Sequence, residues 1–243
     1  HYHLNMRSIR RSTLSEALAK RDTRPFADML IELISLCGRT LRKQAGDLLY
    51  LPDSTPIALK GRGFDQWTGH NGRITGLKLH ILMNHADQCP VAHSITDARV
   101  NDVDERHIVQ PEKGATYVFD KGYCDYNWWA KLDEAGAYFV TRLKINAAVE
   151  TIQKRPTDNP NILSDEYIRF THRQNSRRPN RCHGKILRRI TVSRPGREPL
   201  VSGCVVLKSS AWHADLYGYL FRTVVRLRGN NVSSMFQTVS KFV

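Results

Sequence analysis

The order of short apolar runs between residues 47 and 144 constrains the fold of this chain most strongly. Three runs with tight connections come first and predict an antiparallel meander: DLLYLPDSTPI (47–57), WTGHNGRITGLKLHILMNH (67–85) and CPVAHSITDARVND (89–102). A strand, a helix and a last strand are expected from ATYVFD (115–120), DYNWWAKLDEAG (125–136) and AYFVTRLKI (137–145). A meander followed by helix-linked strands predicts a mixed sheet with helices packed on it.

Capping residues complete this order. Asp102 and Glu105 have the spacing of a capping box and predict a helix through about Val109. Gly136 is expected to close the later helix. The full order, strand-strand-strand-helix-strand-helix-strand, is that of the ribonuclease-H-like fold. We therefore expect an α/β fold with a ribonuclease-H-like mixed sheet, in which the ends of the first and fourth strands lie side by side. Those ends are Asp53, where the first strand is expected to break after Pro52, and Asp120.

The rest of the 243-residue chain is expected to surround this catalytic core at 47–144. An N-terminal helical segment covers 1–46, with a capping box at Thr13 and Glu16 and with Pro25 in the first turn of a second helix. A β-rich basic insertion covers 145–208, where KILRRITVSRP and PLVSGCVVLK alternate with loop-like sequence. A degenerate C-terminal tail covers 209–243.

Charge is distributed unevenly along the chain. The formal net charge is +14, and from Tyr167 onward there are 15 Lys and Arg residues against two acidic ones. This asymmetry favours nucleic acid as a partner over the alternative, a basic solvated surface. The five cysteines form no CxxC pair, which argues against a disulfide framework and fits a reducing cytosol. No apolar run is long enough for a membrane span, and no secretory signal is recognisable, so we expect a cytoplasmic protein.

Asp53 and Asp120 are the candidate chemical residues. Two carboxylates on neighbouring strand ends can hold Mg²⁺, which prefers hard oxygen ligands and takes the remaining ligands from water and substrate phosphate. In a two-metal site with ions about 3.5–4 Å apart, one ion activates the attacking hydroxyl and the other stabilises the leaving oxygen. The alternative for each residue alone is an ordinary turn, because PDSTP and DKG are also good turn sequences. Their shared position in the predicted sheet favours the metal-ligand interpretation.

The segments LLYLPDSTPIAL (48–59) and YVFDKGYCDY (117–126) resemble the first and second acidic motifs of DDE transposases of bacterial insertion sequences. The resemblance covers about residues 4 to 208. It is strongest to the branch whose third motif is Tyr-x2-Arg-x3-Glu-x6-Lys, the IS-four group. It implies DNA cleavage and strand transfer with Mg²⁺ (or Mn²⁺), with Asp53 and Asp120 as catalytic metal ligands. It also implies double-stranded DNA partners, namely element terminal repeats and target, and a homodimer across two DNA ends. A prokaryotic, nucleoid-associated location is implied only by this family resemblance.

The third motif departs from the family pattern. Tyr219-x2-Arg222 fits its start, but Arg226 then occupies the position of the Glu, and Ser233 that of the Lys. Since a cation stands where a metal must bind, we expect little or no strand transfer and suspect a frameshift or truncation near Tyr217. Two alternatives stay open. Beside an inactive DDE transposase, the chain could be a non-enzymatic DNA-binding remnant, which binds element ends or inhibits an intact transposase, or an unrelated ribonuclease-H-like nuclease.

Basic residues of the insertion are the main DNA-binding candidates, with a mobile solvated hairpin as their alternative. The full candidate set is Lys121, Arg177, Arg178, Arg181, Lys185, Arg188, Arg189, Tyr219 and Arg222. Trp128 and Trp129 are expected in the core rather than stacked on bases. The cluster His80, His85, Cys89 and His93 leaves a zinc site open as an alternative, but its spacing matches no common structural zinc pattern. We therefore expect His80 and His93 to alternate with apolar strand residues.

Overall fold

The structure is a computed structural model. It describes residues 10–41, 48–59, 68–85, 89–144, 146–158, 160, 162–175, 178–194 and 197–207. The chain forms two compact units, His1–Lys43 and Gln44–Val243. The predicted tail at 209–243 lies outside the described residues. No helix in the described ranges is long and apolar enough to cross a membrane.

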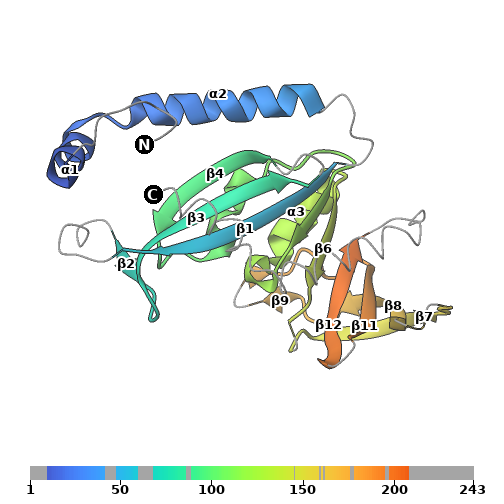
Figure 1. Cartoon of the computed structure of the whole chain (residues 1–243). Helices are drawn as coiled ribbons and strands as arrows, with labels where there is room; N and C mark the ends of the chain where they lie inside the picture. Colours follow the sequence, from blue (N-terminus) through green and yellow to red (C-terminus); the bar gives the residue numbers. More distant parts are fainter. Residues whose placement is uncertain are drawn as a thin grey trace. The chain divides into compact units, whose positions relative to one another are not determined.

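The N-terminal unit consists of two helices, α1 (Arg11–Lys20) and α2 (Arg24–Leu41) (Figure 1). Pro25 lies in the first turn of α2, as predicted. The predicted capping box is wrong, because α1 already begins at Arg11, ahead of Thr13. Several large apolar side chains of α2 are at least 41% exposed, namely Phe26, Met29, Leu30, Ile31, Leu33 and Leu36.

The second unit is built on a mixed sheet whose first three long strands form the predicted meander. They are β1 (Leu49–Ala58), β3 (Thr75–Asn84) and β4 (Pro90–Asp97), and the pairs β1–β3 and β3–β4 are both antiparallel. The short strand β2 (Gly69–His70) pairs with the beginning of β3. The strands β5 (Thr116–Phe119) and β6 (Tyr138–Arg142) follow on the other side of β1, and both of these pairings are parallel. The order β4-β3-β1-β5-β6 confirms the ribonuclease-H-like arrangement.

The first strand is longer than the sequence predicted. Pro52 does not break it, because β1 stays paired with β3 as far as Ala58, opposite Gly76. On the β5 side, pairing among the described residues ends at Tyr50, opposite Tyr117. Proline is tolerated where one side of a strand needs no amide donor. Asp53 therefore lies within β1, just beyond its parallel pairing with β5.

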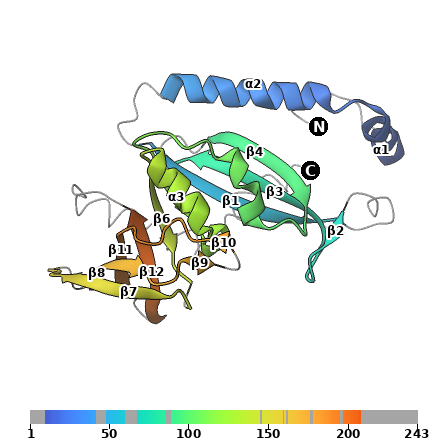
Figure 2. The ribbon, with the colours of Figure 1, turned by 180° about the vertical axis from the view of Figure 1, so that it is seen from behind.

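One helix, α3 (Tyr126–Glu134), packs against the sheet beside β6 and is seen most clearly from behind (Figure 2). The Asp125 carboxylate accepts hydrogen bonds from the backbone N–H of Asn127 (2.8 Å) and Trp128 (3.3 Å) at its start. Gly136 follows its end with φ of 73°, as predicted. Trp128 and Trp129 are buried among Phe119, Tyr123, Tyr126, Phe139 and Phe170, which confirms them as core residues.

Two short 3-10 helices complete this region, η2 (Asp102–Ile108) and η3 (Lys121–Tyr123). The helix expected from Asp102 onward is thus present as η2, but its N-cap is Asn101 rather than Asp102. The carboxylate of Asp102 is instead bonded to residues of β1 and β3.

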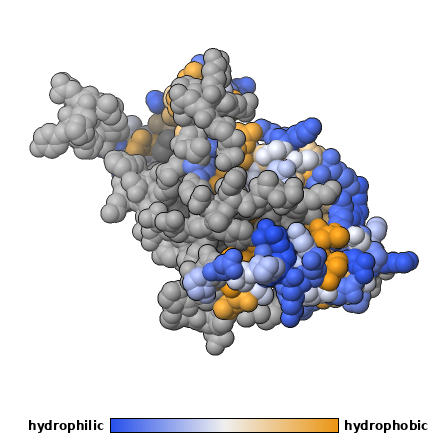
Figure 3. All heavy atoms as spheres, turned by 90° about the vertical axis from the view of Figure 1, so that its right-hand side faces the viewer, coloured by the Kyte–Doolittle hydropathy of each residue, from blue (hydrophilic) through white to orange (hydrophobic). Residues whose placement is uncertain are grey.

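The basic insertion continues the same sheet. Its long strands are β7 (Val149–Arg155), β8 (Ile162–Phe170), β11 (Leu187–Arg194) and β12 (Arg197–Leu207), and the antiparallel pairing of β12 with β6 joins them to the core strands. A two-stranded sheet, β9 (Gln174–Asn175) with β10 (Arg178–Pro179), lies between β8 and β11 in the sequence. Hydrophilic side chains cover much of the described surface on the face seen in Figure 3, with a few hydrophobic residues among them.

Candidate active site

Asp53 and Asp120 occupy equivalent positions on neighbouring strands. Tyr50 of β1 lies opposite Tyr117 of β5 in their parallel pairing. Each aspartate comes three residues later, and Asp120 keeps an extended backbone (φ −79°, ψ 166°) at the N-cap of η3. Because side chains alternate along extended chain, both carboxylates are placed on the same face of the sheet. The structure therefore brings together the two residues that the sequence singled out.

Asp53 is a half-buried carboxylate in a negative environment. Burial raises its pKa, the backbone N–H of Ser54 opposes this rise, and the charges of Asp102 and Asp120 add to it. Two like charges this close disfavour ionisation of both groups unless a cation lies between them. The environment of Asp53 is thus one that a bound cation would stabilise.

Asp120 already has a cation beside it. Arg142, the last residue of β6, donates from Nε to Asp120 Oδ1 at 2.8 Å, and its Nη2 contacts the same oxygen. The backbone N–H of Lys121 also donates to this Oδ1, at 2.5 Å. Sequence reasoning missed Arg142. The parallel register predicts it, because Phe119 lies opposite Thr141 and the next pair along is Asp120 and Arg142.

Asp102 lies close to the chain segments that follow both aspartates. Its Oδ1 accepts a hydrogen bond from Ser54 Oγ at 2.6 Å and from Lys78 Nζ at 3.1 Å. Lys78 Nζ also donates to the Val100 carbonyl at 2.6 Å. The other carboxylate oxygen of Asp102, Oδ2, lies so close to Gly122 that a Cβ added to Gly122 would be only 2.8 Å from it. Asp102 therefore contacts the residue after Asp53 and the turn after Asp120.

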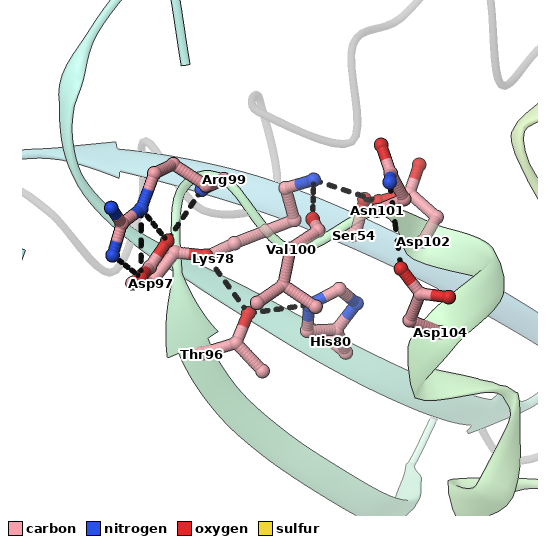
Figure 4. Close-up of polar contacts among 10 residues, drawn as sticks. All are labelled: Ser54, Lys78, His80, Thr96, Asp97, Arg99, Val100, Asn101, Asp102 and Asp104. Atoms are coloured by element: carbon pink, nitrogen blue, oxygen red, sulfur yellow. Dashed lines mark hydrogen bonds and ion pairs between the residues drawn. The ribbon is translucent and has the colours of Figure 1, made fainter. Parts of the chain in front are cut away.

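Polar groups continue between η2 and the meander strands. His80 is fully buried, and its Nε2 lies 3.0 Å from Thr96 Oγ1 (Figure 4). Burial lowers the pKa of His80. Ser94 Oγ donates to Glu105 Oε2 at 2.8 Å. His80 thus belongs to a buried polar layer, in line with the expectation that it alternates with apolar strand residues.

The donor chemistry of Asp53 and Asp120 suits a hard divalent ion. Among the residues that the structure describes, no group of three or more His, Cys, Asp or Glu side chains is placed to hold a metal. Two carboxylates can still hold Mg²⁺, since this ion keeps several waters and binds substrate phosphates. The chemistry of the described residues is therefore compatible with part of a metal site, for which Asp53 and Asp120 are the candidate ligands.

Four predicted DNA-binding residues are engaged in internal ion pairs. Arg188 pairs with Asp165 at 2.6 Å and Arg189 with Glu166 at 2.5 Å, both between β11 and β8. Arg181 pairs with Glu134 of α3 at 2.8 Å, and Lys185 contacts Asp133. The sequence suggested arginines without acidic neighbours. In the fold, acidic residues of β8 and α3 lie beside them, and Asp165 and Glu166 directly precede the strongly basic stretch that begins at Tyr167.

The other basic candidates differ in their surroundings. Lys121 and Arg178 are exposed, and neither forms an ion pair within the described part of the chain. Lys121 directly follows Asp120, whereas Arg178 lies on β10. Arg177, Tyr219 and Arg222 lie outside the described residues, as does Arg226.

Comparisons with known proteins show which family the chain resembles. Residues 44–226 match the family profile of the transposase DDE domain. The chain is 38% identical over 186 residues to "Putative transposase y4zB" of Sinorhizobium fredii, covering 74% of this chain and 50% of that protein. It thus spans about half the length of this curated relative. A piggyBac transposase in a synaptic complex with hairpin DNA is similar at a TM-score of 0.49 and 10% identity, over 93% of this chain and 47% of that one.

Proposed function

Since this chain belongs to the family of transposase DDE domains, we propose that it binds the ends of an insertion element with Asp53 and Asp120 as metal ligands. The observation that carries this proposal is the register of β1 and β5, which gives the two carboxylates equivalent positions on parallel neighbours. Its partners are double-stranded DNA, as terminal repeats and target, and a second copy of the chain across the two DNA ends. This role assigns it to the nucleoid in the cytoplasm.

The residues of the proposed site have different roles. Asp53 and Asp120 would hold Mg²⁺ or Mn²⁺, and an ion bound there would supply activation of a hydroxyl and stabilisation of the leaving oxygen in phosphodiester chemistry. Asp102 fixes the chain after each of them through Ser54 and Gly122. Lys121 is exposed beside Asp120 and is suited to contact a DNA phosphate. Arg178, also exposed, is the matching candidate on β10.

We also propose that this chain supports little or no strand transfer. The branch signature in the sequence aligns Arg226 with the third carboxylate, so a guanidinium stands at the position of a metal ligand. This observation favours a second candidate function, in which the chain occupies element ends without cutting them or inhibits an intact transposase by mixed assembly.

Metal binding tests the assignment of Asp53 and Asp120. Isothermal titration calorimetry with MnCl2 is expected to detect binding to the wild-type chain that Asp53→Asn and Asp120→Asn each remove. Asp97→Asn is the matched control, because Asp97 lies at the end of β4 and pairs with Arg99. Equal binding by all four proteins would refute Asp53 and Asp120 as ligands.

DNA assays separate the candidate functions. Labelled duplexes from the genomic segments that flank the coding sequence are incubated with the chain and MnCl2. Retention of repeat-containing duplexes without joined products is expected. Joined products that Asp120→Ala abolishes would contradict the proposed lack of strand transfer. Nicking of any duplex regardless of repeats would instead indicate a general nuclease.

A further inference from the structure

Arg142 is an anchored cation beside an exposed carboxylate. Its side chain is only 10% exposed, whereas that of Asp120 is 58% exposed. The backbone around it is held by both neighbours of β6, with Thr141 opposite Phe119 of β5 and Arg142 opposite Cys204 of β12. The guanidinium is therefore fixed to the sheet, while the carboxylate that it binds remains open to solvent ions.

The geometry of this pair differs from that of a structural ion pair in the same protein. Arg188 binds Asp165 through two separate bonds, Nε to Oδ1 at 2.8 Å and Nη2 to Oδ2 at 2.6 Å, and the two side chains are 14% and 7% exposed. The Nε and Nη2 donors of Arg142 instead converge on one oxygen, Oδ1 of Asp120. In a pair of this kind, both donors of the positively charged guanidinium lie against a single carboxylate oxygen.

We infer that Arg142 is an internal competitor for the metal at Asp120. This inference rests on the proposed function, in which Asp120 is a metal ligand. The guanidinium and a divalent ion both seek the negative charge of this carboxylate, and like charges repel at such short range. Metal binding to Asp120 must therefore displace the guanidinium from Oδ1 or overcome its charge. Arg142 sets how tightly the site holds its metal and keeps Asp120 neutralised when none is bound.

The size of the effect follows from the behaviour of carboxylates beside arginine. An arginine within hydrogen-bond distance of a carboxylate oxygen repels a second cation that approaches the same oxygen, and a divalent ion feels this repulsion twice as strongly as a singly charged one. A metal ion competes for the same charge. Removal of Arg142 is therefore expected to tighten metal binding by at least about tenfold.

The test measures the Mn²⁺ affinity of the full chain by isothermal titration calorimetry with MnCl2. Arg142→Gln is expected to bind Mn²⁺ at least about tenfold more tightly than wild type. Arg142→Lys, which keeps the charge but loses the two converging donors, is expected to fall between them. Arg169→Gln is the matched control, because Arg169 forms a 2.5 Å pair with Glu150 on strands β8 and β7 and carries the same charge. Its affinity is expected to equal that of wild type.

The outcomes distinguish this inference from the proposed function. Asp120→Asn must remove binding in both the wild-type and the Arg142→Gln backgrounds. If it does, and Arg142→Gln binds no tighter than wild type, the competition is refuted and the metal site stands. If no protein shows Asp120-dependent binding, both are refuted. Circular dichroism checks the folding of each variant. Should Arg142→Gln fail to fold, an affinity of Arg142→Lys at or below that of wild type would overturn the inference.

Discussion

Gly122 shows how a single residue without a side chain permits the site geometry. A Cβ at this position would approach Asp102 Oδ2 to 2.8 Å, closer than real Cβ contacts allow. The same carboxylate accepts from Ser54 and Lys78 through Oδ1, so it cannot shift without loss of those bonds. The glycine after Asp120 and Lys121 is thus required by the close approach of Asp102, not by a turn alone.

Gly122→Ala is therefore expected to destabilise the protein by about 1–3 kcal/mol, the usual cost of an overpacked contact. Urea unfolding measures this loss. The control is a double-mutant cycle with Asp102→Ala, since the two substitutions should be strongly non-additive if the contact is responsible. Additive losses would show that Gly122 matters for another reason.

The buried His80 is expected to make the free energy of unfolding depend on pH. Burial lowers its pKa in the folded state, the charges of Asp102 and Glu105 oppose this, and those of Lys78 and His107 add to it. In the unfolded chain a histidine binds a proton near pH 6.5. As the pH falls below about 6.5, the unfolded state therefore binds more protons than the folded state, and the free energy of unfolding decreases.

His80→Gln should remove part of this decrease. The slope of unfolding free energy against pH, measured by urea titration between pH 7 and 5, is expected to become shallower than in wild type by up to about 1.4 kcal/mol per pH unit. His85→Gln provides a comparison, because burial also lowers the pKa of His85. An unchanged slope in His80→Gln would contradict a neutral buried His80.

Strands and helices differ in how much of them the sequence could predict. The meander, α3 and the two parallel strands follow from apolar runs and capping signals, and the neighbouring positions of Asp53 and Asp120 follow from the strand order. The extension of β1 beyond Pro52 could not be predicted from local sequence, because it depends on tertiary pairing. Beyond Tyr50, β1 stays paired with β3 but not with β5 among the described residues, so the missing amide donor of Pro52 is tolerated. Arg142 and Asp102 were missed for a related reason: each acts through a partner on a different element.

Between β8 and β11, ion pairs replace the free basic surface that composition suggested. Arg188 and Asp165 have side chains only 14% and 7% exposed. Arg188→Ala is expected to cost about 1.5–3 kcal/mol, because it removes both charge-assisted hydrogen bonds of the buried Asp165 carboxylate and leaves it only the longer pair with Arg155 at 3.9 Å. The double variant Arg188→Met with Asp165→Leu is expected to be more stable than the single one. Thermal unfolding followed by circular dichroism checks this, and a double variant less stable than Arg188→Ala would contradict it.

For the whole molecule, net charge overstates the number of cations available to DNA. The chain carries +14, yet several of its arginines are already paired with acidic side chains. Each phosphate contact contributes about 0.9 to the slope of log affinity against log salt concentration. Arg178→Gln, which removes an exposed cation, is therefore expected to reduce that slope by about one.

Fluorescence anisotropy of a labelled duplex between 50 and 200 mM NaCl measures this slope. Arg189→Gln is the contrasting variant, because it breaks the pair with Glu166 and should reduce thermal stability while it leaves the slope unchanged. The opposite pattern, a reduced slope for Arg189→Gln and an unchanged slope for Arg178→Gln, would indicate that β11 contacts the DNA and β10 does not.

The pairing of β12 with β6 also bears on how the chain folds. The residue opposite Arg142 on β12 is Cys204, so the strand beside the active site receives its outer neighbour only after the whole insertion has been made. Until then β6 is an open edge with unpaired amides and carbonyls, the kind of edge that recruits other chains. Such long-range pairing is also slow to form. The pairing with β12 therefore covers an edge of the core sheet that would otherwise be open on that side of β6.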